Sequence, residues 1–223
     1  MGTRSPLRIH WNTLFRFAVV LVAAATATAC GAHTADYTSL LPSSPSSAAP
    51  TTSATPTPIA QYLDSVGVTG QQVPLDKLTN LTVTLPRPAG WTKYSNANFS
   101  PGTEAIAKNN TYPTAMVMVF KLSGNFDVPA AMAHANDDAL LAKGFTRLNY
   151  SNNDFDGFPS SMIEGSYDHL GTRLHTYNRV VIPVASDFQR YLVQFTVTTL
   201  ADQAAAAAPD VQKIIEGFSV SVK

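Results

Sequence analysis

Three side chains close together in the chain, Ser166, Asp168 and His175, are of the types that form a hydrolytic triad. In a triad the histidine takes the serine proton, and the carboxylate orients the imidazole ring. The usual setting is missing, because Ser166 has no Gly-x-Ser-x-Gly elbow and no glycine-rich helix start offers an oxyanion hole. His169, His175 and Asp168 also lack the spacing typical of zinc ligands. We therefore predict no catalytic residue, no metal site and no cofactor.

The stretch that contains these residues, 157–184, is predicted to form a long β-hairpin. Two runs of strand-forming composition meet at Leu170-Gly171, which is expected to be a two-residue turn. That turn sets three cross-strand pairs, namely Asp168–Arg173, Ser166–His175 and Glu164–Tyr177. Because successive side chains of a strand point to opposite faces, one face is polar and the other is mostly apolar.

The polar side of this hairpin is the predicted binding face, and we expect it to be solvated. Its proposed contact residues combine carboxylates, arginines and aromatic or imidazole rings: Glu164, Asp168, Arg173, His175, Tyr177 and Arg179. Such a mixture on a wet surface suits an amphipathic lipid, a glycolipid or a protein partner. An alternative of equal weight is a set of cross-strand surface pairs that binds no ligand.

The first thirty residues have the pattern of a secretory signal. Three arginines without an acid precede the apolar run 17–25, which is too short to span a bilayer as a mature helix. Small residues then lead to Cys30, the only cysteine, as in the lipobox of bacterial lipoproteins, although Ala27 stands where leucine is commoner. The alternative is an ordinary cleavage site with a leftover thiol. We expect residues 1–29 to be removed and palmitate-type chains on Cys30 to hold the protein on the extracytoplasmic face of the cell membrane.

Residues 30–58 are predicted to form a tether. They are mostly Ser, Thr, Ala and Pro, so they cannot bury a core, and their prolines favour an extended spacer. The full chain has 223 residues, with 15 basic and 15 acidic side chains. Without a net positive charge or a basic block, nucleic acid is not an expected partner.

The remaining 165 or so residues, 59–223, are enough for one domain. Their patterns predict helices at 59–66, 128–143 and 200–217, and strands at 82–85, from 91, 104–108, 115–122, 190–198 and 218–222. The second helix has a predicted buried stripe of Val128, Met132, Ala135, Ala139 and Leu140. Strands cluster and helices intervene singly, which indicates an α+β class with an antiparallel β-sheet packed with helices.

Several segments of this domain resemble the LpqN/LpqT family of mycobacterial cell-envelope lipoproteins. The segments are Tyr62–Gly70, Tyr112–Met116, Phe120–Leu122, Gly157–Met162, Gly165–Tyr167, Arg173–Thr176 and Gln189–Gln194. The resemblance implies an α/β sandwich similar to the Mog/PsbP group, no known enzymatic activity, and a link to envelope lipid transport, host interaction and virulence. It supplies no catalytic motif to carry over.

Three functions from different classes follow. The first is a membrane-anchored, non-catalytic binding or accessory module for an envelope lipid, glycolipid or membrane transporter. The second is a host-interaction lipoprotein whose anchor is sensed by innate immune receptors, and the third is a weak hydrolase. An apolar groove beside the hairpin favours the first function, and a flat exposed patch favours the second. We expect a monomer.

Overall fold

The computed structural model describes residues 55–223, so Cys30, the predicted signal peptide and most of the predicted tether lie outside the described residues. The elements run in the order α1 (Ile59–Ser65), β1 (Thr69–Gln72), η2 (Leu75–Lys77), β2 (Leu81–Thr84), β3 (Trp91–Lys93), β4 (Glu104–Lys108), β5 (Thr111–Ser123), α2 (Val128–Met132), α3 (Asp137–Leu140), β6 (Thr146–Ser151), β7 (Ser160–His169), β8 (Thr172–Val181), β9 (Tyr191–Leu200), η3 (Ala201–Gln203), α4 (Ala204–Gly217) and β10 (Ser219–Val222). In this part of the chain, no helix has the length and apolar character needed to cross a membrane.

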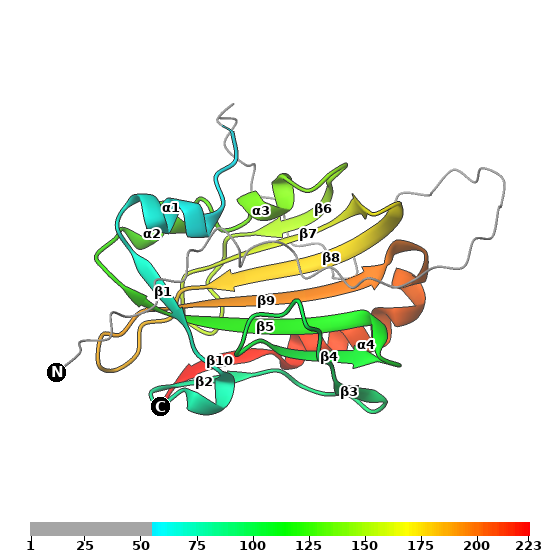
Figure 1. The fold of residues 1–223 in the computed structure, drawn as a ribbon, viewed down its shortest axis with the longest axis horizontal. Helices are drawn as coiled ribbons and strands as arrows, with labels where there is room; N and C mark the ends of the chain where they lie inside the picture. Colours follow the sequence, from blue (N-terminus) through cyan, green and yellow to red (C-terminus); the bar gives the residue numbers. More distant parts are fainter. Residues whose placement is uncertain (1–54) are drawn as a thin grey trace.

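An antiparallel, eight-stranded sheet organises the domain (Figure 1). Seven strands follow the order β3-β4-β5-β9-β8-β7-β6, and β1 pairs with β5 beside them. A second, two-stranded sheet joins β10 to β2. The expected α+β class, an antiparallel sheet packed with helices, is confirmed.

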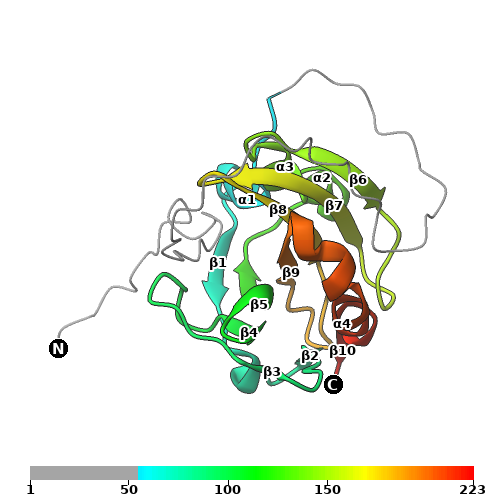
Figure 2. The same cartoon turned by 90° about the vertical axis from the view of Figure 1, so that its right-hand side faces the viewer.

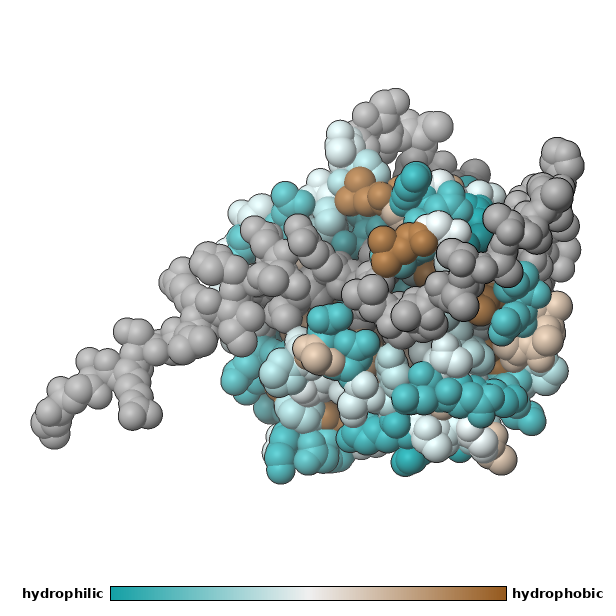
Figure 3. Space-filling view, turned by 45° about the vertical axis from the view of Figure 1, so that its right-hand side comes forward, coloured by the Kyte–Doolittle hydropathy of each residue, from teal (hydrophilic) through white to brown (hydrophobic). Residues whose placement is uncertain are grey.

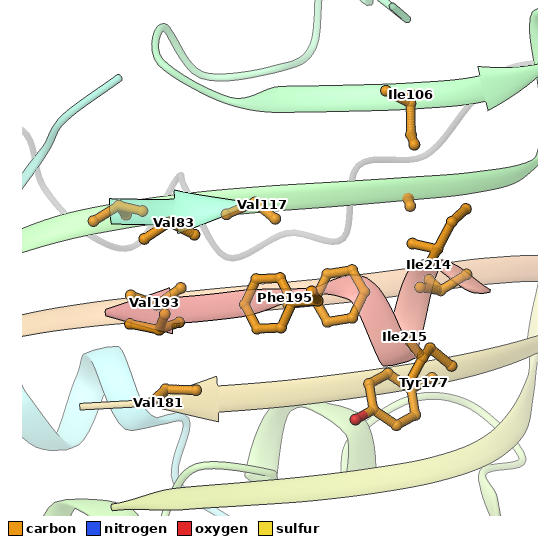
Figure 4. Close-up of a cluster of buried hydrophobic side chains, with 14 of the residues drawn as sticks. Val83, Ile106, Val117, Tyr177, Val181, Val193, Phe195, Ile214 and Ile215 are labelled. Carbon is orange, nitrogen blue, oxygen red and sulfur yellow. The ribbon is translucent and has the colours of Figure 1, made fainter. Parts of the chain in front are cut away.

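Helices cover the large sheet on both faces, with α1, α2 and α3 on one side and α4 on the other (Figures 1 and 2). The α4 side holds the larger core, in which Phe195 of β9 is completely buried (Figure 4). Its ring stacks on Phe218 at a centroid distance of 4.2 Å, and Phe218 stacks on Phe155 at 5.4 Å. This aromatic column joins the centre of the sheet to the chain end that follows α4.

The hairpin forms with the predicted register. Asp168 pairs with Arg173, Ser166 with His175, and Glu164 with Tyr177. Leu170 and Gly171 both have positive φ, 47° and 80°, as a two-residue turn matching the strand twist requires.

Other expectations were wrong in detail. The predicted helix 128–143 is broken into α2 and α3, and this break leaves Leu140 45% exposed instead of buried. Strand β9 lies between β5 and β8 and is covered on both faces. Strands β1 and β6 were not predicted, because both are short and only partly buried.

Candidate functional site

Three of the six residues of the predicted binding face are buried rather than solvated. Glu164, His175 and Tyr177 expose only 1–2% of their area, because this side of the hairpin faces the core beneath α4. The His175 Nε2 atom lies 3.2 Å from Glu164 Oε1, within ion-pair range but without the alignment of a hydrogen bond. Thr199, opposite His175 on β9, is buried as well. The solvation predicted for these residues is therefore wrong: alternation showed which side chains share a face, but not what covers it.

Arg173 gathers the other polar groups at the turn end of the hairpin. Its guanidinium donates to Asp168 Oδ1 at 3.0 Å and to Ser166 Oγ at 2.7 Å. It also donates to the Gly144 carbonyl at 2.9 Å and to Thr146 Oγ1 at 3.0 Å, which ties the hairpin to the start of β6. Asp168 and Ser166 are thus engaged by an arginine rather than aligned with a histidine, so the triad considered from sequence is not assembled.

Arg179 is the second arginine of the predicted face, and it is half-buried. Its Nε donates to Tyr177 Oη at 2.8 Å, and its Nη1 donates to Ser160 Oγ at 2.8 Å. The guanidinium also lies 4.4 Å from the centre of the Phe155 ring, a cation–π distance. Arg179 therefore contacts both Phe155, in the aromatic column of the core, and Ser160, the first residue of β7.

A hollow lies beside this end of the hairpin. Its volume is about 340 Å³, and it is lined by Val128, Pro129, Met132, Ala133, Asn152, Asp154, Pro159 and Ser160. One wall is α2, which begins where the Asp127 side chain accepts a 2.7 Å hydrogen bond from the Ala130 N–H. The opposite wall is the loop between β6 and β7, which supplies the polar side chains of Asn152 and Asp154. The hollow is thus apolar on its helix side and polar on its loop side.

A buried chain of hydrogen bonds fixes the polar wall. Asn136 Nδ2 donates to Ser161 Oγ at 2.5 Å, and Ser161 Oγ donates to Asn152 Oδ1 at 2.6 Å. The first two residues of β7 are therefore both hydrogen-bonded through their side chains: Ser161 to Asn136 and Asn152, and Ser160 to Arg179. Sequence reasoning missed the hollow, because its residues come from two separate segments, 128–133 and 152–160. Asp127 followed by Pro129 was the one local signal, and it located the wall formed by α2.

Acidic groups on α3 hold the beginning of the domain. Asp137 Oδ2 accepts from the Thr57 N–H at 2.8 Å and lies 3.0 Å from His134 Nδ1. The His134 ring stacks on Tyr62 of α1 at a centroid distance of 4.5 Å. Burial, and next the neighbouring charge of Asp137, raise the pKa of Asp138 to about 7. No group of three potential metal ligands occurs between residues 55 and 223.

Comparisons with known proteins agree with the sequence resemblance. Residues 55–221 match the family described as "Probable lipoprotein LpqN". The lipoprotein LpqT of Mycobacterium tuberculosis (strain H37Rv) is 51% identical to this chain over 207 residues, which cover 92% of each protein.

One solved structure shares the arrangement of the domain. The crystal structure of LpqN, described as involved in cell envelope biogenesis of Mycobacterium tuberculosis, covers 74% of this chain and 98% of its own, with a TM-score of 0.64 and 19% identity. The Ran-binding protein Mog1p of Saccharomyces cerevisiae gives a TM-score of 0.40 at 12% identity, over 68% of this chain and 95% of its own. At 19% identity, the likeness to the LpqN structure shows a shared fold alone. The family match and the 51% identity to LpqT show that the sequences are related. This chain therefore belongs to the LpqN/LpqT lipoprotein family.

Proposed function

We propose that this protein is a membrane-anchored lipoprotein of the cell envelope that acts as a non-catalytic binding module for an amphipathic envelope molecule. The anchor is the acylated Cys30, and the ligand site is the hollow between α2 and the loop that follows β6. The observation that carries the proposal is the hollow itself, an apolar wall facing a fixed polar wall beside the hairpin.

The lining defines the class of ligand. Val128 and Met132 offer aliphatic contact, whereas Asn152, Asp154 and Ser160 offer hydrogen-bond donors and acceptors. A hydroxyl-rich head group with a short apolar part satisfies both walls, which describes the polar end of a glycolipid. The volume lies near the lower end of the range of about 300–1,000 Å³ for ligand pockets. The site therefore suits one head group rather than a whole long-chain lipid.

The binding proposal is favoured over the hydrolase alternative by the state of the polar side chains. Ser166 Oγ accepts a hydrogen bond from Arg173, and His175 is buried against Glu164. A nucleophile must reach its base and its substrate, and neither side chain borders the hollow. Of the predicted binding face, Arg179 is linked to the hollow through its hydrogen bond to Ser160, a lining residue.

Native mass spectrometry of protein purified from a mycobacterial host tests the ligand site. We expect a co-purifying lipid or glycolipid in the wild type and its loss in Ala133→Trp, which fills the hollow from α2. Ala130→Trp, on the same helix but outside the lining, is the matched control and should keep the ligand. A wild type without any bound species, or equal retention by the two variants, would contradict the proposed site.

Anchoring is tested separately by Cys30→Ala. The variant should lose its acyl chains and leave the membrane fraction, since each buried CH₂ contributes about 0.8 kcal/mol to membrane binding. Persistent association of the variant with membranes would count against lipidation.

A further inference from the structure

The segment of residues 128–141, here called the α2–α3 ledge, exposes apolar side chains. Leu140 and Leu141 are 45% and 51% exposed, and Pro129 and Ala133 of the same ledge are also exposed. On the face drawn in Figure 3, exposed apolar side chains gather in a few patches on a largely hydrophilic surface. Single exposed apolar residues are ordinary, but adjacent ones on one ledge indicate an interaction surface.

The ledge lies where the chain enters the folded domain. The Thr57 N–H donates to Asp137 on α3, and Tyr62 stacks on His134 between α2 and α3. From Cys30 to Thr57 the chain is 27 residues long, so its contour cannot exceed about 100 Å. A lipid surface that holds an acylated Cys30 is therefore always within reach of the ledge, at a high effective concentration.

Charges beside the ledge agree with a lipid surface. Lys143 and Arg147 follow the two leucines and are exposed. The nearby acids are Asp137, Asp138 and Asp168, together with the exposed Asp127, which caps α2, and the exposed Asp154 in the wall of the hollow. Asp137 is occupied by Thr57 and His134, and Asp168 is paired with Arg173. Burial raises the pKa of Asp138, which reduces its negative charge. Basic side chains next to apolar ones are typical of surfaces that lie in the membrane interface.

We propose that the α2–α3 ledge docks onto the lipid surface that carries the anchor, with Leu140 and Leu141 inserted among the head groups. This inference rests on the anchoring proposed above. Four lining residues of the hollow, Val128, Pro129, Met132 and Ala133, belong to the ledge. Docking therefore brings the mouth of the hollow to the membrane, and a lipid head group enters it without leaving the lipid surface.

Quenching of tryptophan by brominated lipid tests the docking. The full-length protein, matured and acylated, is placed in vesicles of brominated phosphatidylcholine with a minor fraction of phosphatidylglycerol. Leu141→Trp puts a fluorophore on the ledge, and Phe188→Trp puts one outside the ledge, on the turn between β8 and β9, where Phe188 is 88% exposed. Trp91 is 4% exposed and provides a constant background. We expect Leu141→Trp to lose more than half of its added emission, and Phe188→Trp to lose little.

A second variant separates docking from simple proximity. Adding Leu140→Asp to Leu141→Trp should restore most of the quenched emission, while the protein still floats with the vesicles. Equal quenching at the two positions would overturn the docking, because it describes a domain without a preferred orientation. A blue-shifted but unquenched Leu141→Trp would overturn it too, since the ledge is then covered by the tether or a second copy. Flotation reports anchoring alone, so a failure of the anchor is distinguished from a failure of docking.

Discussion

Replacing His175 with alanine tests whether the buried pair under α4 stabilises the fold. In the wild type the His175 and Glu164 side chains are 3% and 1% exposed and lie 3.2 Å apart. Removing the imidazole leaves Glu164 in the core without this neighbour, with a space where the ring was. Breaking one side of a buried pair costs about 3–5 kcal/mol. That is a large part of the 5–15 kcal/mol by which a domain is typically stable.

The chain offers a matched control of the same chemistry. His134 and Asp137 lie 3.0 Å apart, but their side chains are 30% and 15% exposed. His134→Ala also removes the stacking on Tyr62, so we expect a loss of about 1–2 kcal/mol. The double variant Glu164→Leu/His175→Leu removes both polar groups and should recover much of the loss, because a buried pair replaced by apolar side chains is often neutral.

Urea unfolding followed by Trp91 fluorescence measures these differences, because Trp91 packs in the core beside α4. With a slope of about 2 kcal/mol per molar urea, His175→Ala should lower the midpoint by roughly 1.5–2.5 M, and His134→Ala by less than about 1 M. A midpoint for His175→Ala no lower than that of His134→Ala would refute the reasoning. The same result limits any use of His175→Ala as a test for hydrolysis, since a loss of activity would report unfolding.

Three further changes have defined outcomes. Phe195→Ala removes the ring that stacks on Phe218 in the core and should cost about 3–5 kcal/mol in the same urea assay. Gly165→Ala places a Cβ 2.5 Å from the Phe145 ring and 2.6 Å from the Thr146 carbonyl. It should lower the melting temperature and, in hydrogen exchange, loosen the pairing of β6 with β7; unchanged protection there would contradict this. Because burial raises the pKa of Asp138 from 3.8 to about 7, the folded state keeps a proton that the unfolded chain releases. Stability from this group is complete below about pH 4 and falls as pH rises to 7, by up to about 4 kcal/mol. Asp138→Asn should flatten thermal stability between pH 5 and 8, and an unchanged slope would reject the assignment.

Short sequence motifs correctly predicted the turn of the hairpin and the start of α2. The Leu170-Gly171 pair predicted the hairpin register, because Gly171 readily takes the positive φ of a tight turn; Leu170 adopts positive φ as well, although a side chain with a Cβ rarely does. Asp127 and Pro129 located the start of α2. The end of that helix was not predictable in the same way, because its apolar spacing continues through α3. At the break, residues 133–136, the buried Asn136 donates to Ser161, a partner 25 positions away that local spacing does not reveal.

The site was harder to predict, because the covering of a sheet face is a tertiary property. Alternation placed Glu164 and His175 on one face correctly, and its polarity suggested water. In the fold, α4 and the core beneath it cover that side of the sheet, so Glu164 and His175 are buried there. The polar side chains Glu164 and His175 therefore lie against each other inside the protein rather than in solvent. The surfaces that we propose for a ligand and for a membrane are the hollow and the α2–α3 ledge, where the helical stripe predicted a core. A misplaced polar face and a misplaced apolar residue, Leu140, are thus two consequences of one limitation: periodicity assigns residues to faces, and only packing decides which faces meet water.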